Sequence, residues 1–208
     1  LSNGYIDSPE KKHIRGRIFV LQSLIASSFG DVDGMITHGN QALELLPEGD
    51  LTWRNITHFA LGDAYSFQGD MAASFEARSN AVKACEAAGD PYYIIMANLK
   101  LSTTFRETGE LERTINICRE QIRTGKKFGL ENNSSLGYLW TLWAEVLTEK
   151  NDLNAGIKLA RKGVEITKQG SNVMILGFAY LNLLRVLVSS EDLAGAKNII
   201  EEVQVLNA

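Results

Sequence analysis

Apolar and small residues recur at helical spacing through nearly the whole chain, and short polar turns interrupt them at regular intervals. Five turns share one form, a polar pair followed by an apolar residue, and they begin at Gly30, Gly69, Gly109, Asn151 and Glu191. The intervals are about 40 residues, within the range of helical-hairpin repeats. Because periodic stretches stand before and after each turn, every interval predicts two helices joined by a turn.

The periodicity predicts helices at residues 11–28, 32–46, 51–68, 71–88, 91–108, 111–128, 134–150, 153–169, 172–189 and 193–207. Paired across the turns, they form repeats at 11–49, 50–90, 91–130, 131–170 and 171–208. A single hairpin leaves apolar surface uncovered, so neighbouring hairpins must stack. The predicted fold class is therefore all-α, a superhelical solenoid that forms a single domain over residues 1–208. First helices should line its concave surface.

The junctions between repeats contain residues that commonly end or begin helices. Gly49-Asp50 and Gly89-Asp90-Pro91 each provide a glycine to end one helix and an aspartate to cap the next. Pro91 also suits a first helical position, which needs no amide donor. We expect Gly170-Ser171 to act in the same way, and either Asn133 or Ser134 to cap the seventh helix.

Stretches in and just before the second repeat resemble a known family. The pattern Leu61-Gly62-x-x-Tyr65 followed by Gly69-Asp70 resembles the tetratricopeptide repeat (TPR). Together with Leu46-Pro47 and Asp50-Leu51-Thr52-Trp53-Arg54, it is similar to the sensor region of MalT-like regulators. These are large ATP-binding bacterial transcription activators of the LuxR type. The fourth and fifth repeats depart from the pattern, because Asn151 and Glu191 replace the turn glycine.

The resemblance implies a cytoplasmic sensor that binds a small inducer or an inhibitory regulatory protein. Binding would control ATP-dependent self-association of the full-length protein and promoter activation. In the family, an ATPase module precedes the repeats and a helix-turn-helix domain follows them. The chain begins at Leu1 rather than methionine and contains no phosphate-loop motif, so we expect it to be a fragment of such a regulator.

Composition narrows the possible partners. With 45% hydrophobic and 22% charged residues, the chain can bury a substantial core. Its formal charge of −4 argues against direct nucleic-acid contact, which requires a surplus of basic side chains on one face. No run approaches the roughly 20 apolar residues that a membrane-spanning helix needs, so we expect no membrane partner.

Candidate chemistry is sparse, and we expect no enzyme, no cofactor and no metal site. His13, His38 and His58 fall in different predicted helices without the spacing of paired metal ligands, so each should be solvated or hydrogen-bonded. Cys85 and Cys118 lack CxxC spacing and should be small core residues. No G-x-S-x-G motif marks a nucleophile. The sequence thus predicts a binding protein.

The candidate ligand site lies on the faces of first helices that point away from their hairpin partners. The predicted ligand-binding residues combine aromatic, amide, hydroxyl and charged groups: Asn55, Phe59, Asp63, Asn98, Arg106, Tyr138, Thr141, Glu145 and Arg185. This mixture suits a polar small molecule or a peptide segment, and Arg106 and Arg185 could bind a carboxylate or phosphate. The alternative is that these are simply solvated side chains on a curved surface.

Two functions therefore remain open. One is a sensor that binds a small inducer on the concave face. The other is a protein-interaction scaffold that binds a partner helix or extended peptide. A small inducer should occupy a closed pocket, whereas a peptide should need an open groove.

Overall fold

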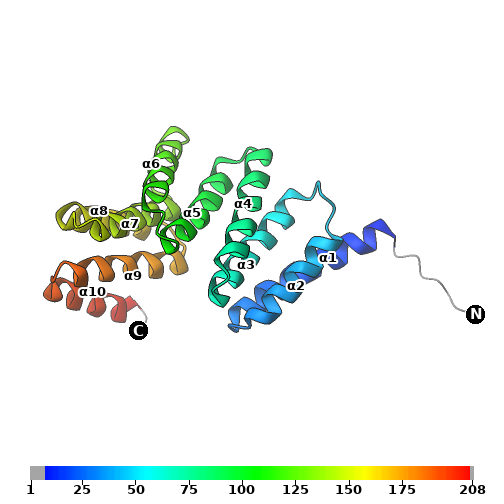
Figure 1. Cartoon of the computed structure of the whole chain (residues 1–208), viewed down its shortest axis with the longest axis horizontal. Helices are drawn as coiled ribbons and strands as arrows, with labels where there is room; N and C mark the ends of the chain where they lie inside the picture. The colour runs from blue at the N-terminus through cyan, green and yellow to red at the C-terminus, as the bar shows by residue number, and fades with distance from the viewer. Residues whose placement is uncertain (1–7, 207–208) are drawn as a thin grey trace, which may run out of the picture. The chain divides into compact units, whose positions relative to one another are not determined.

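The computed structural model describes residues 8–206, and in that range it consists of ten helices joined by short turns (Figure 1). The helices are α1 (Pro9–Ser28), α2 (Val32–Leu45), α3 (Leu51–Gln68), α4 (Met71–Ala88), α5 (Pro91–Glu107), α6 (Leu111–Lys127), α7 (Ser134–Glu149), α8 (Leu153–Lys168), α9 (Val173–Ser189) and α10 (Leu193–Leu206). All the predicted helices are confirmed, with bounds within about two residues. No helix of this range is long and apolar enough to cross a membrane.

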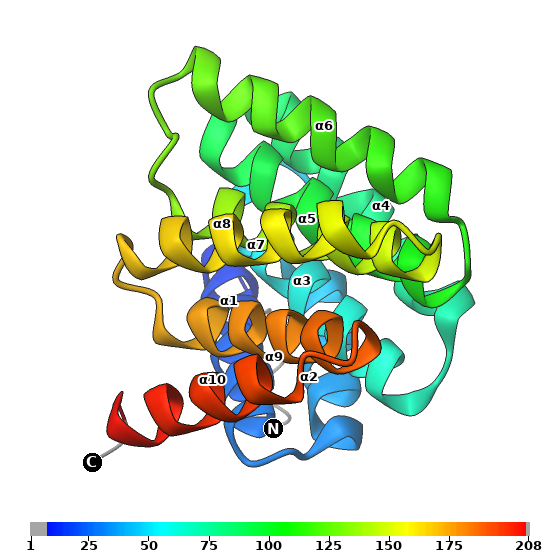
Figure 2. The ribbon, with the colours of Figure 1, turned by 90° about the vertical axis from the view of Figure 1, so that its left-hand side faces the viewer.

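The chain divides into two compact units, Leu1–Asp90 and Pro91–Ala208. The division coincides with the predicted junction between the second and third repeats. The first unit contains the hairpins α1–α2 and α3–α4, and the second contains α5–α6, α7–α8 and α9–α10. Figure 2 shows the three hairpins of the second unit following one another in sequence order. That the whole chain forms one domain stays a prediction.

The turn inside each hairpin has a left-handed residue followed by an aspartate or glutamate. The φ angles are 69° at Gly30, 84° at Gly69, 78° at Gly109, 64° at Asn151 and 58° at Glu191. At four of the five turns the next residue is an aspartate whose side chain accepts a hydrogen bond from a backbone N–H three residues later: Asp31, Asp70, Asp152 and Asp192. Asn151 and Glu191 thus keep the glycine conformation despite carrying a Cβ, which costs energy in that region.

The two helices of a hairpin approach closely where small residues meet. Ser74 Oγ on α4 donates to the Gly62 carbonyl on α3 at 2.8 Å. On α8 the matching position is Gly156, where an added Cβ would lie 3.2 Å from the Ala144 carbonyl of α7. At the same distance from their turns stand Thr114 in the third hairpin and Ala196 in the fifth, whereas the larger Met35 stands there in the first.

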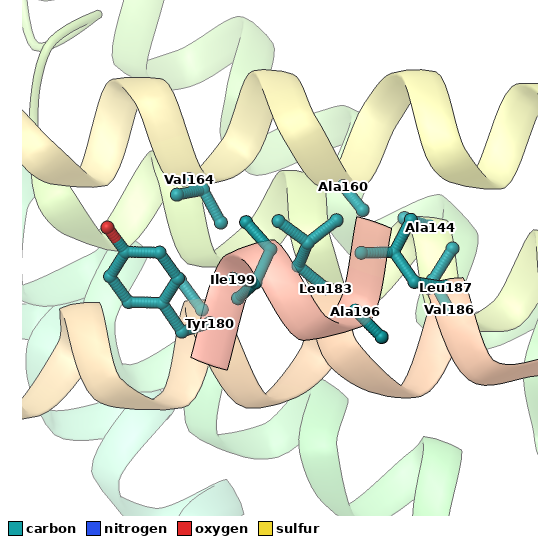
Figure 3. Packing of buried hydrophobic residues seen from close by; sticks show 10 residues of the cluster. Ala144, Ala160, Val164, Tyr180, Leu183, Val186, Leu187, Ala196 and Ile199 are labelled. Atoms are coloured by element: carbon teal, nitrogen blue, oxygen red, sulfur yellow. The ribbon is translucent and has the colours of Figure 1, made fainter. Parts of the chain in front are cut away.

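Stacked hairpins share an apolar interior within each unit. In the second unit, buried side chains from α7, α8, α9 and α10 form one cluster (Figure 3): Ala144, Ala160, Val164, Ala179, Tyr180, Leu183, Val186, Leu187, Ala196 and Ile199. In the first unit, Val20, Ala42 and Leu46 pack with Phe19, Trp53 and Ile56 from α1, α2 and α3. The expectation that neighbouring hairpins cover each other's apolar faces is therefore confirmed inside both units.

At two helix boundaries the predicted position is correct, but the residue predicted to cause the boundary is wrong. Helix α2 ends before Gly49, because Leu46 precedes Pro47 and is extended, with φ −74° and ψ 128°. Asp50 does not cap α3 with its side chain. Its carboxylate instead pairs with Arg17 at 3.0 Å and contacts His13, and these hydrogen bonds lower its pKa although burial opposes the shift.

The remaining junctions give mixed outcomes. Gly89 ends α4 with φ 74°, and α5 begins at Pro91, both as predicted. Asn133 caps α7, since its side chain accepts from the Ser135 N–H. The Gly170-Ser171 prediction is wrong, because Asn172 caps α9 by accepting from the Ile175 N–H at 3.0 Å. An amide one residue further along reaches that donor.

Candidate functional site

The main candidate site lies on the first helices of the second unit. Helix α7 contacts both α5 and α9, so three first helices lie side by side. Six of the predicted ligand-binding residues occupy them: Asn98 and Arg106 on α5, Tyr138, Thr141 and Glu145 on α7, and Arg185 on α9. The structure thus gathers residues that are far apart in sequence onto one face of the unit.

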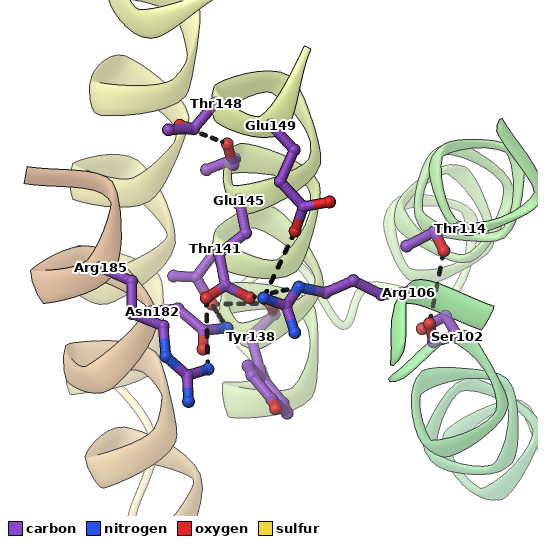
Figure 4. Close-up of polar contacts among 11 residues, drawn as sticks. Ser102, Arg106, Thr114, Tyr138, Thr141, Glu145, Thr148, Glu149, Asn182 and Arg185 are labelled. Carbon is purple, nitrogen blue, oxygen red and sulfur yellow. Dashed lines mark hydrogen bonds and ion pairs between the residues drawn. The ribbon is translucent and has the colours of Figure 1, made fainter. Parts of the chain in front are cut away.

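The centre of this face is an ion-pair cluster around Glu145, whose side chain is only 3% exposed. Arg106 Nε lies 2.9 Å from Glu145 Oε2, and Arg185 Nη1 donates to Glu145 Oε1 at 3.3 Å (Figure 4). Arg106 Nη2 also lies 3.4 Å from Glu149 Oε1. One carboxylate on α7 therefore holds a guanidinium from each neighbouring helix.

Burial controls the electrostatics of this cluster. It raises the pKa of Glu145, although the positive charges of Arg106 and Arg185 favour the charged form. Burial, with the nearby Glu145 charge, also raises the pKa of Tyr138 to about 12, so its hydroxyl stays protonated at neutral pH. Two guanidinium groups face two carboxylates, Glu145 and Glu149, and their charges balance. These ion pairs connect α7 to α5 and α9, and the two arginine side chains lie at the edges of the cluster.

Nearer the start of α7, polar and aromatic side chains also pair with residues of α9. Asn182 Nδ2 on α9 donates to Thr141 Oγ1 at 3.1 Å, and Thr141 Oγ1 donates to the Tyr138 carbonyl at 2.8 Å (Figure 4). The rings of Tyr138 and Phe178 stack with centroids 6.0 Å apart and planes 18° apart. The pairs join residues about 40 positions apart, which is the repeat period.

A cavity of about 260 Å³ adjoins the ion pairs. It is lined by Arg106, Glu145, Thr148, Glu149, Arg185, Val186 and Ser189. The Arg185 side chain is 52% exposed, so most of its donors remain open to a ligand. The cavity can therefore hold a small polar group against an arginine that is already oriented by Glu145.

Asn98 and Phe59 take no part in these contacts. Asn98 Nδ2 donates to the Ile94 carbonyl of its own helix at 3.0 Å. Phe59, on α3 of the first unit, is half-buried.

Two predicted residues of α3 face their own hairpin partner, so the expectation that they point away from it is wrong. Asn55 is 5% exposed and its Nδ2 lies 2.6 Å from Cys85 Sγ on α4. Asp63 accepts from Arg78 Nη2 on α4 at 3.0 Å. The actual rotation of α3 about its axis decides this, and three-to-four spacing alone leaves that rotation open.

Sequence reasoning missed the environment of His58. We expected a solvated or hydrogen-bonded side chain, but His58 is 9% exposed and its Nδ1 is buried without a hydrogen-bond partner. Burial, together with the nearby charge of Arg54, lowers its pKa to about 4. Nothing in the local sequence marks it, whereas the 40-residue period does point to pairs such as Glu145 and Arg185. Within residues 8–206, no group of three histidine, cysteine or acidic side chains could hold a metal ion.

Comparison with known proteins identifies the fold. The family model described as the MalT-like TPR region matches residues 16–207. No curated protein matches the sequence. Similar solved structures include BtubC (BKLC) from P. vanneervenii, with 14% identity and a TM-score of 0.69 over 96% of this chain and 82% of that one. The apo form of RapI has 12% identity and a TM-score of 0.69 over 90% of this chain and 68% of that one.

A third similar structure is the Signal Transduction ATPase with Numerous Domains (STAND) protein with a tetratricopeptide repeat sensor, PH0952, from Pyrococcus horikoshii. It has 11% identity and a TM-score of 0.71 over 99% of this chain, which spans 31% of that protein. At such identities the likeness establishes the fold, and the predicted all-α solenoid of TPR-like hairpins is confirmed. Because the family model covers nearly all of the sequence, the chain belongs to the MalT-like TPR region family.

Proposed function

We propose that this chain is the ligand-sensing region of a MalT-like regulator and binds a small polar inducer on the face formed by α5, α7 and α9. The observation that carries the proposal is the buried Glu145 held between Arg106 and Arg185, with a cavity of about 260 Å³ beside it. An oriented, half-exposed arginine next to a cavity is suited to a carboxylate or phosphate group. The stacked rings of Tyr138 and Phe178 offer apolar contact on the same helices.

The regulatory context of the proposal is supported by the family and by one similar structure. The P. horikoshii protein is described as a signal-transduction ATPase whose repeats form a sensor. By analogy, ligand binding here would control an ATPase module and a DNA-binding module of the same regulator. ATP-dependent self-association of the full-length protein and a single-domain arrangement of residues 1–208 belong to this proposal.

An alternative function is a scaffold for a partner protein, and one observation favours it. Helix α9 exposes Met174, Phe178, Leu181 and Val188, which are 67%, 41%, 43% and 54% exposed and lie near the candidate face. Such a row along one helix suits the apolar side of an amphipathic partner helix. An inhibitory protein could therefore use the same surface.

A thermal-shift screen of metabolites on this chain tests the first function. A ligand at 100 times its Kd should stabilise the protein by about 2.7 kcal/mol and raise the melting temperature by about 5 to 10 °C. Arg185→Ala should abolish the shift. Arg123→Ala is the matched control, because Arg123 is an exposed arginine of α6 outside the cavity, and it should respond like wild type. If no metabolite stabilises the chain while a protein co-purifies and is lost on Phe178→Asp, the scaffold function is correct.

A further inference from the structure

A second cavity lies in the first unit, between α2, α3 and α4, and measures about 190 Å³. Apolar side chains from all three helices contribute to it, including Leu43, Leu61 and Ala77. Five polar side chains also line it: Asn40, His58, Tyr65, Glu76 and Asn80. We call this cavity the His58 groove. Helical spacing explains the set, because the lining residues of each helix recur three or four positions apart on one face.

None of these five polar side chains forms a hydrogen bond or ion pair with another residue of the described chain. Asn40 and Glu76 are exposed and can be hydrated, whereas His58 is 9% exposed. Buried polar groups are nearly always satisfied, since leaving one unpaired costs free energy. His58 thus brings an imidazole without a protein hydrogen-bond partner to the wall of the cavity.

The charge of the groove favours a cationic ligand. Within the described residues, Glu76 is the one charged side chain that lines the cavity, and Arg54, whose positive charge acts on His58, lies outside the lining. The lowered pKa of His58, about 4, keeps its ring neutral at pH 7. A neutral imidazole can accept a hydrogen bond, as can the amide oxygens of Asn40 and Asn80. The groove thus combines one carboxylate with several neutral acceptors.

We propose that the His58 groove binds a guanidinium or protonated amine group, with Glu76 as its counter-ion and the amides of Asn40 and Asn80 as acceptors. A volume of about 190 Å³ corresponds to about six water molecules, so the groove holds such a group with a few carbon atoms. A guanidinium suits this wall well, because its planar donors can engage a carboxylate and neighbouring acceptors together. The site is separate from the arginine-rich face of the second unit.

The cationic group has two possible sources, a free small amine or an arginine side chain of a peptide. Isothermal titration of the 208-residue chain at low ionic strength distinguishes them with two probes, agmatine and N-acetyl-arginine amide. N-acetyl-citrulline amide is the neutral control of nearly equal shape. We expect saturable binding of at least one cationic probe and at least about tenfold weaker binding of the citrulline compound. Preference for agmatine indicates a free amine, and preference for the acetylated amide indicates a peptide.

Matched variants locate the binding. Glu76→Gln should lower the affinity for the cationic probe by about tenfold or more, because it removes the counter-ion. Glu76 faces solvent, so the substitution should leave the fold intact. Glu86→Gln, an exposed acid of the same helix outside the groove, should leave the affinity unchanged. Long-range ¹H–¹⁵N spectra of the histidine rings should show the His58 resonances shifting on titration, while those of His38 stay fixed. Absence of saturable binding, or equal loss in both glutamate variants, would overturn the proposal.

Discussion

In the second unit, the charged side chains of the candidate face pair with one another across helices, whereas in the first unit the polar side chains of the His58 groove have no partner within residues 8–206. Glu145 holds Arg106 and Arg185, and Asn182 donates to Thr141. The polar groove residues make no such contacts with the part of the chain that the structure describes. Both regions lie on the same kind of helical hairpin. The difference shows that the repeat supplies the frame, while the side chains at particular positions of each hairpin decide whether a region connects helices or stays open to a ligand.

Burial shifts the pKa values of the two regions in opposite directions. It raises the pKa of Glu145 and lowers that of His58, because in each case the charged form is penalised. Arginines offset the penalty for Glu145 only in part, while Arg54 adds to it for His58. Opposite pH dependence is therefore a property that separates the two regions.

Charge reversal in the second unit should have the largest effect. Glu145→Lys would place a third cation between Arg106 and Arg185 in a buried position, and it should lower the free energy of unfolding by about 3 to 5 kcal/mol. Chemical denaturation measures this loss. Glu149→Lys, whose side chain is 42% exposed, is the matched control and should cost about 1 kcal/mol or less. Equal losses would mean that Glu145 is not the centre of the cluster.

Lowering the pH tests whether His58 of the first unit is buried in its neutral form. His58 has a folded-state pKa of about 4 against an ordinary value of 6.5, so the unfolded chain binds the proton first. Its contribution to stability is present above pH 6.5 and is lost as the pH falls towards 4, by up to about 3 kcal/mol. Denaturant titrations of wild type and His58→Leu at several pH values isolate the contribution of His58, since every other group is shared by the two proteins. Parallel pH profiles would contradict the burial of a neutral His58.

The turns extend the comparison, because glycine occupies both hairpin turns of the first unit while two of those in the second unit lack it. Glu191 has φ 58°, a left-handed conformation that costs a residue with a Cβ about 1 kcal/mol. Glu191→Gly should therefore stabilise the chain by about 1 kcal/mol, and Asn151→Gly by less, since asparagine tolerates this region better. Thermal unfolding measures both. Destabilisation by Glu191→Gly would show that its side chain has an unrecognised role.

Neutralising Glu145 should have the smallest effect on stability. Because its pKa is raised, the folded protein disfavours the charged carboxylate, and Glu145→Gln should change the free energy of unfolding by about 1 kcal/mol or less. The sign of its pH dependence is opposite to that of His58. Glu145 contributes stability below its unfolded pKa near 4.5 that is lost as the pH rises through the folded pKa, so the glutamine variant should gain relative to wild type over that range. A constant difference across pH would contradict the raised pKa.

Local patterns were enough to predict the helices, because periodicity, left-handed turns and aspartate caps act within a few residues. The errors at Gly49 and Ser171 also have local causes, since Pro47 already ends α2 and the neighbouring Asn172 already caps α9. The error at Asp50 has a tertiary cause, because its carboxylate pairs with Arg17 on another helix. The pairing of Glu145 with Arg185 follows from the 40-residue period once hairpins are stacked.

The amino-acid sequence was therefore sufficient for the hairpins, their order, their turns and the family resemblance that the family model confirms. It could not predict that Asn55 meets Cys85 or that His58 is buried without a partner. Those outcomes depend on the rotation of each helix about its axis and on which side chains of neighbouring helices come within hydrogen-bond distance. Such distances are set only when the helices pack, because the residues that meet are separated by tens of positions along the chain.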